Sequence, residues 1–245
     1  MVIMLVGILV ALLAPTISGA RQASQDTMSL SNLRQHAAVF AAYAGDCDDT
    51  FPFITDPDAS YTVLRCESED IGVKAPYFGA HCYWNYALAD MYYLGRCHEE
   101  SFYPPGYPHG MGDASIRSGA TYYWYPCAFI GRPEFWDPRR RSGLNQLGPT
   151  RQSEVVYSSR KSLLVAHYPF VIDAVGPLDY DDPLLAACMT FVDGSGAKIS
   201  IGAIGSGYPM GDGLWKQWRG SMHVSDGWPL AHHTLEGVRG WDVQR

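Results

Sequence analysis

Six cysteines offer the most definite chemistry in this 245-residue chain, because a thiol can bind metal, carry a redox reaction or form a disulfide. They are Cys47, Cys66, Cys82, Cys97, Cys127 and Cys188. Their number is even and no two form a CxxC pair, which disfavours a zinc ribbon, a thioredoxin-type site and CxxCH haem attachment. The spacing predicts up to three disulfides in an oxidising compartment and leaves their pairing open.

Two acidic clusters are the next candidates for chemistry. They are Asp46, Asp48 and Asp49, and Asp179, Asp181 and Asp182. Calcium takes six to eight oxygen ligands, and carboxylates on a loop supply several of them. Neither cluster has the EF-hand spacing, so the first is interpreted as a solvated turn. The second has the same interpretation, with a structural calcium ion as its alternative.

Histidines and catalytic motifs give little support for an enzyme. His232 and His233 are adjacent, so their side chains diverge on a regular element, and His223 adds only a weak indication of zinc. The chain has no GxSxG, HExxH, phosphate-binding loop or GxGxxG motif. We therefore expect no catalytic residues and no cofactor other than the calcium considered above.

Charge is unevenly distributed along the chain. The net charge is −7, yet residues 1–44 carry only Arg21, Arg34 and Asp26, so the remainder is strongly acidic. Nucleic-acid binding needs a basic surface, which argues against nucleic acid as a partner. The only basic run, at 139–141, is interpreted as a solvated loop.

The first twenty residues contain no charged side chain and are mostly apolar, so they must be shielded from water. A cleavable signal peptide is one reading, with a small-residue site at 18–20, although no basic residue precedes the apolar run. A membrane anchor is a second, although Pro15 and the polar residues after it weaken the span. The third is the first half of one long helix.

The long-helix reading rests on residues 21–44, the amphipathic half. Its apolar residues recur at steps of three and four: Leu30, Leu33, Ala37, Phe40 or Ala41, and Ala44. Gly45 is a natural residue to end the helix. Such a helix is about 65 Å long, so residues 1–20 are expected to project beyond the globular part, with Gly7 to Pro15 as its weakest stretch.

Residues 45–245 form the predicted head, an α+β domain. Short β-prone runs (TYYWYPCAFI, VVYSS, SLLVAHYPFVI, CMTFVDGSGAKISIG) predict an antiparallel sheet packed on the second half of the helix. Asp193-Gly194 predicts a hairpin turn. The aromatic, Pro- and Gly-rich stretch 98–138 is interpreted as ordered loops over the sheet, with a subunit interface or a glycan-binding surface as alternatives.

The front of the chain resembles type IV pilins and type II secretion pseudopilins. MVIMLVGILVALLAPTISGAR resembles the family's apolar helix, and SLSNLRQHAAVFAAYAGDCDDTFP the stretch after it. Weaker similarities follow in LRCESED, SEVVYSSRKSLLVAH and MTFVDGSGAKIS. Two features depart from the family pattern: Pro183 replaces a subgroup histidine, and no basic leader or assembly glutamate precedes Gly7.

The resemblance implies a structural subunit of a pilus-like or pseudopilus filament. Its partners would be copies of itself, the pilus or secretion assembly machinery, and the inner membrane before assembly; its location would be an extracellular filament or the cell surface. The expected polymerisation residues are Ile3, Leu5, Val6, Gly7, Ile8, Leu9, Leu12, Leu13 and Pro15. The family also implies that Gly7 to Pro15 unwinds in filaments. The alternatives are a minor tip pilin and a membrane-tethered extracellular enzyme or lectin.

Overall fold

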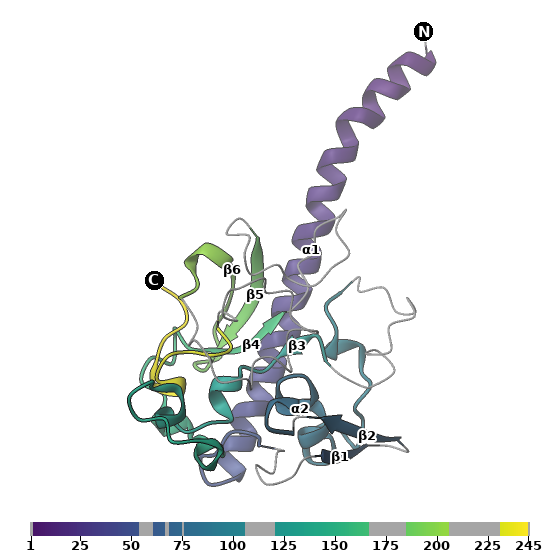
Figure 1. The fold of residues 1–245 in the computed structure, drawn as a ribbon. Coiled ribbons are helices and arrows are strands. Elements are labelled where there is room, and N and C mark those ends of the chain that lie inside the picture. The colour runs from purple at the N-terminus through teal and green to yellow at the C-terminus, as the bar shows by residue number, and fades with distance from the viewer. Residues whose placement is uncertain are drawn as a thin grey trace.

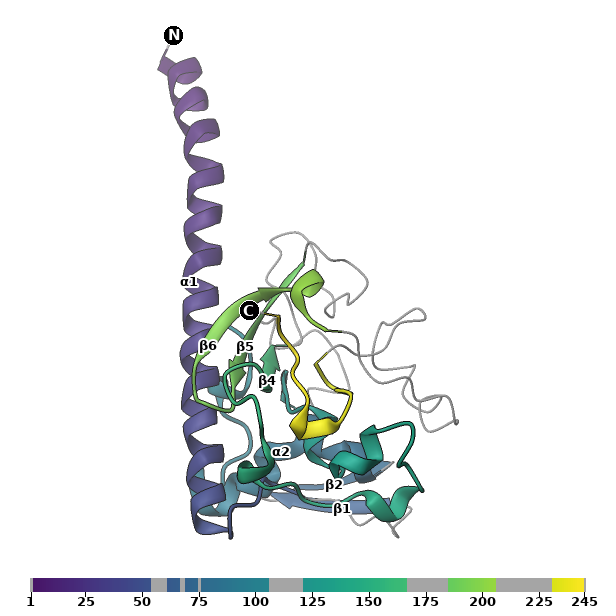
Figure 2. The ribbon, with the colours of Figure 1, turned by 90° about the vertical axis from the view of Figure 1, so that its left-hand side faces the viewer.

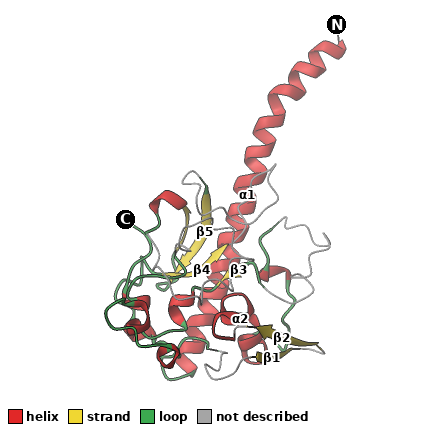
Figure 3. Cartoon of the chain, in the orientation of Figure 1, coloured by secondary structure: helices red, strands yellow, loops and turns green. Residues whose placement is uncertain are grey.

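A long helix and a head of mixed helix and strand make up the chain (Figure 1). The computed structural model describes residues 2–53, 61–66, 69–74, 76–105, 121–166, 185–205 and 231–244. Their side chains are described from residue 15 onward, except 61–62, 69–80 and 144. Helices, strands and loops are separated by colour in Figure 3. The α+β class and the long N-terminal helix are confirmed.

Helix α1 spans Val2–Asp46 and continues across Pro15. The predicted end at Gly45 was wrong, because α1 runs past that glycine. The chain turns at Asp48 and Asp49, whose φ angles of 52° and 65° are left-handed. Aspartate tolerates this conformation better than most residues. The Asp49 N–H donates to the Ala44 carbonyl at 2.8 Å and closes the last turn.

Four antiparallel strands form the main sheet in the order β3-β4-β5-β6. Their bounds are Tyr123–Trp124, Ser162–Ala166, Ala186–Phe191 and Gly196–Ser200. The predicted hairpin is confirmed: Gly194 has φ of 80°, and its N–H donates to the Phe191 carbonyl at 2.9 Å. The sheet packs on the second half of α1, as expected, and β5 and β6 run beside the helix in Figure 2.

A second unit lies near the C-terminal end of α1 and was not predicted. It contains the hairpin β1 (Tyr61–Cys66) and β2 (Glu69–Lys74), followed by helix α2 (Pro76–Tyr92). Tyr83 has non-helical backbone angles and marks a kink in α2. Two predicted strands were also too long, because TYYWYPCAFI forms only the short β3 before a 3-10 helix, and VVYSS forms a turn.

Short 3-10 helices make up most of the remaining regular structure. They are η1 (Glu100–Phe102), η2 (Cys127–Phe129), η3 (Pro133–Trp136), η4 (Leu144–Gln146), η5 (Gln152–Glu154), η6 (Ile201–Ala203) and η8 (Gly237–Arg239). They carry many of the aromatic side chains of the core. The main cluster includes Phe40, Phe51, Trp84, Phe102, Tyr123, Tyr125, Phe129, Phe135 and Trp136. In the described part of stretch 98–138, the prediction of ordered packing is therefore confirmed.

Candidate functional site

The first half of α1 extends beyond the head in two perpendicular views (Figures 1 and 2). The predicted polymerisation residues from Ile3 to Leu13 belong to this helix, and their side chains lie outside the described residues. Pro15 is exposed, and Ile17 is 65% exposed. The hydroxyl of Ser18 donates to the Pro15 carbonyl at 3.0 Å. The first half of α1, called the rod below, is therefore attached to the head at one end, and its N-terminal end lies away from the head.

The second half of α1 anchors this rod in the head. Leu33, Ala37, Phe40 and Ala44 are all buried, as the spacing predicted. The ring of Phe40 lies 5.2 Å from that of Trp84. Burial of a large apolar side chain stabilises a fold by about 1.5–3 kcal/mol. This face therefore holds helix and head together.

Polar contacts between α1 and the β5-β6 hairpin fix the orientation of the helix on the head. Lys198 on β6 forms an ion pair with Asp26 at 2.7 Å. The guanidinium of Arg34 donates to the Gly196 carbonyl at 3.1 Å, and a Cβ on that glycine would lie only 3.2 Å from Arg34 Nε. The absence of a side chain at Gly196 thus allows the β5-β6 turn to approach the helix.

His36 is buried in this interface and was missed by sequence reasoning. Its Nε2 lies 2.7 Å from the Ser101 carbonyl, and its Nδ1 lies 2.7 Å from the Tyr93 hydroxyl. A carbonyl only accepts, so Nε2 carries the hydrogen and Nδ1 accepts from tyrosine. Burial lowers the pKa of His36 to about 4, against a smaller opposing effect of the Ser101 hydrogen bond. The imidazole is neutral and structural at pH 7.

The acidic cluster at the foot of α1 shapes the turn and binds neighbouring segments. Asp46 accepts from the Tyr92 hydroxyl at 2.7 Å, and Asp49 accepts from the Ser153 N–H at 3.1 Å. The second cluster, at 179–182, lies outside the described residues. Within the residues that the structure describes, no group of three His, Cys, Asp or Glu side chains is placed to hold a metal ion.

A buried polar network lies between β4 and the segment 231–244. Lys161 and Asp242 form an ion pair at 3.2 Å, with side-chain exposures of 0% and 1%. Ser162 donates to Asp242 Oδ2 from its backbone N–H at 2.8 Å and its hydroxyl at 2.6 Å. Thr234 completes the network. Sequence reasoning missed it because its members are far apart in the chain.

The two adjacent histidines face different aromatic rings, as their adjacency predicted. His232 lies 5.6 Å from the Trp124 ring and His233 lies 5.1 Å from the Trp136 ring. Both are buried. Burial, and then the nearby Lys161 charge, lower the pKa of His232 to about 3. They act as neutral core groups, and His223 lies outside the described residues.

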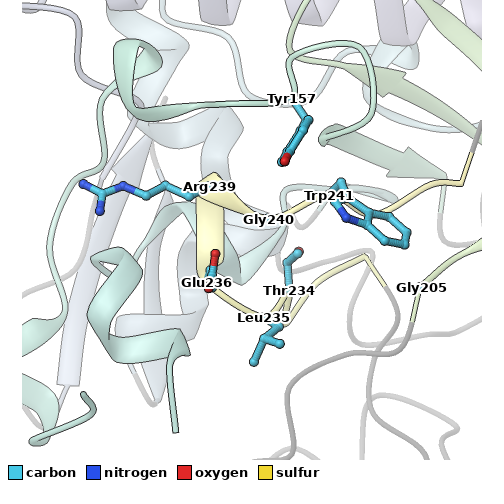
Figure 4. A pocket seen from close by; sticks show the side chains of 8 residues that line it. All are labelled: Tyr157, Gly205, Thr234, Leu235, Glu236, Arg239, Gly240 and Trp241. Atoms are coloured by element: carbon cyan, nitrogen blue, oxygen red, sulfur yellow. The ribbon is translucent and has the colours of Figure 1, made fainter. Parts of the chain in front are cut away.

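A pocket of about 270 Å³ opens next to the buried network (Figure 4). Tyr157, Thr234 and Trp241 line it, together with Gly205, Leu235, Glu236, Arg239 and Gly240. The Arg160 guanidinium lies 4.6 Å from the Trp241 ring and 5.8 Å from the Tyr157 ring, which fixes both aromatic groups. An aromatic wall beside hydroxyl and carboxylate groups suits a small polar ligand.

One of the predicted disulfides is present, between Cys66 and Cys97, with a Cα–Cα distance of 6.3 Å. The other four candidates, Cys47, Cys82, Cys127 and Cys188, carry no disulfide in the described structure. Burial raises the pKa of the Cys188 thiol to about 11, with a smaller effect of Asp26. That thiol is therefore a poor nucleophile at neutral pH.

Comparisons with known proteins do not place the chain in a family. No family model matches it, and no curated protein or solved structure shows significant similarity to it. A search of the described residues finds no helix of the length and apolarity that a bilayer span requires. A functional proposal therefore depends on three features of the structure: the arrangement of helix and head, the pocket, and the buried network.

Proposed function

We propose that this chain is the structural subunit of a type IV pilus-like or pseudopilus filament. The N-terminal helices would pack together in the centre, and the heads would form the outer surface. The observation that carries the proposal is the division of α1, whose second half packs one apolar face on the head while its first half extends beyond it. The resemblance of residues 1–52 to pilins supports the same arrangement.

The energetics of the rod favour polymerisation. Nine Val, Ile and Leu residues lie in the first thirteen: Val2, Ile3, Leu5, Val6, Ile8, Leu9, Val10, Leu12 and Leu13. Burial of about 1.5–3 kcal/mol for each gives an upper bound on the order of 10–30 kcal/mol, before ordering costs. A head-to-tail contact that does not close on itself produces a helical filament. Contacts between rods therefore supply enough free energy to hold a subunit.

The proposal also implies a location for the chain before and after assembly. Before assembly, the inner membrane would cover the rod, and the pilus or secretion machinery would transfer it into the filament. The acidic heads would then lie outside the cell. The Cys66–Cys97 disulfide supports this location, because disulfides persist in oxidising compartments.

Electron cryo-microscopy of the full chain, purified without detergent, tests the proposal. Wild-type protein is expected to form filaments with the helices at the axis. Leu9→Lys is expected to abolish them, because a buried unpaired charge costs several kcal/mol. Leu94→Lys is the matched control, since it adds the same charge at a head position that is 85% exposed. Monodisperse wild-type monomers, or equal filament yields from both variants, would refute the proposal.

A minor subunit at the filament tip is the second candidate, and the pocket at Tyr157 and Trp241 is the observation that favours it. Aromatic rings beside polar groups are suited to a sugar or another small polar ligand. A glycan array probed with full-length wild type and Trp241→Ala tests it. Binding that is lost in the variant supports a tip adhesin, and no binding by wild type excludes a glycan-binding role.

A further inference from the structure

The buried pair Lys161 and Asp242 has the geometry of two groups poised to react. Lys161 Nζ lies 3.2 Å from Asp242 Oδ1, and neither side chain is exposed by more than 1%. The Phe129 ring lies 5.6 Å from the same nitrogen. A buried ion pair contributes little net stability, because desolvation offsets most of the Coulomb attraction. Its presence at the centre of the head therefore calls for another role.

The hydrogen bonds around the pair provide a path for protons. Lys161 Nζ donates to Thr234 Oγ1, and Thr234 Oγ1 donates to Asp242 Oδ1. A proton can thus pass from the amine through the threonine hydroxyl to one carboxylate oxygen. The other oxygen, Oδ2, is held by the backbone N–H and the hydroxyl of Ser162. Two donors on one oxygen stabilise the negative charge that develops when a nucleophile adds to the carbonyl carbon.

We propose that Lys161 and Asp242 condense to an intramolecular amide, an isopeptide bond across the head. The Nζ lone pair attacks Cγ of Asp242, and the tetrahedral intermediate places its charge on Oδ2, against the two Ser162 donors. Thr234 relays two protons from the nitrogen to Oδ1: one before the attack, which converts the ammonium and carboxylate into an amine and a carboxylic acid, and one after it, so that Oδ1 can leave as water. The Cγ–Oδ1 bond then breaks and one water leaves. An ammonium and a carboxylate become an amide and water, so no oxidant, reductant or co-reactant is needed.

Burial of the pair assists the attack. Burial lowers the pKa of Lys161, with the Asp242 charge opposing, and thereby favours the neutral amine that has the lone pair. Burial of both side chains also disfavours the reverse reaction, because hydrolysis needs water at the carbonyl carbon. Effective molarities for groups held in contact are high enough to make such intramolecular steps fast.

The bond would tie two segments that backbone hydrogen bonds already align. The N–H groups of Asp242 and Val243 donate to the Arg160 carbonyl at 3.0 and 3.3 Å. Lys161 directly precedes β4, and Asp242 is 81 residues further along the chain. A covalent link at this point would close a long loop and join β4 to the last described segment. This consequence does not depend on whether the chain forms filaments.

Intact-mass measurement of the full chain, fully reduced and denatured, tests the proposal. The expected mass is below the sequence mass by one water, about 18 Da, after disulfides are opened. Trypsin is then expected to release residues 161–198 joined to residues 240–245, because an acylated Lys161 is not cleaved. A wild-type mass equal to the sequence mass overturns the proposal, and so does free Lys161 in the digest.

Two variants and a control locate the reaction. Lys161→Met keeps the length of the side chain but has no amine, so it should retain the full mass. Thr234→Val removes the relay, and the fraction linked after a fixed time should fall at least tenfold. Lys198→Met is the control, because Lys198 pairs with Asp26 at the surface, and its water loss should equal that of wild type. A water loss that survives Lys161→Met refutes the assignment.

Discussion

Loss of the Cys66–Cys97 disulfide should destabilise the head by a predictable amount. The bond closes a loop with a sequence separation of 31. In the chain-entropy treatment, a loop of this length contributes about 3.5–4 kcal/mol to the free energy of unfolding. The loop begins at the last residue of β1 and contains β2 and α2, so the unit near the end of α1 should lose the most order.

Urea unfolding of wild type and of the double variant Cys66→Ala/Cys97→Ala measures this effect. With an m-value of about 3 kcal/mol/M, the midpoint should fall by about 1.2 M. Cys47→Ala is the matched control, because Cys47 carries no disulfide in the described structure. This variant should leave the sensitivity of the urea midpoint to reductant unchanged. Wild type should lose the same stability on reduction. If oxidised and reduced wild type unfold at the same midpoint, the reasoning is refuted.

Three further predictions address the core, the interface histidine and a crowded glycine. Phe40→Ala should lower the free energy of unfolding by about 3–5 kcal/mol in chemical denaturation, because it leaves a cavity in the aromatic core. The pKa of His36 is about 4 when folded and about 6.5 when unfolded, so the unfolded state binds the proton first. His36 alone should therefore lower the stability by up to about 3 kcal/mol between pH 6.5 and 4, in addition to the effect of His232, and His36→Gln should remove the His36 part of that slope. Gly240→Ala should lower the thermal midpoint by several degrees, because its Cβ would lie 2.1 Å from the Leu235 carbonyl oxygen, whereas Gly148→Ala meets nothing within 4 Å.

The second half of α1 and the β5-β6 hairpin were predictable because their signals are local. Leu33 and Phe40 follow the helical period, and Asp193-Gly194 has the residue types that a tight turn requires. The end of α1 was not predictable from Gly45. Asp48 and Asp49 supply the left-handed residues instead, and Asp49 is held there by Ser153, which is 104 residues away.

The buried network could not be predicted from the sequence, because its members are also far apart along the chain. Lys161 looks like a surface residue between Arg160 and Ser162, and only the return of Asp242 to this place gives it a partner. Helix α2 was missed because its aromatic residues resemble those of strands, and tertiary packing decides between the two. The pocket is built by segments on both sides of residues 206–230, so no local pattern marks it.

The contacts that cover α1 have a consequence for synthesis. Asp26 meets its partner Lys198 only 172 residues later in the chain. At about 5–20 residues per second, the ribosome needs roughly 10–30 s to make that stretch. During this interval the buried face of the helix has no β5-β6 hairpin to pack on. Docking of the helix on the sheet can therefore be completed only after the hairpin emerges.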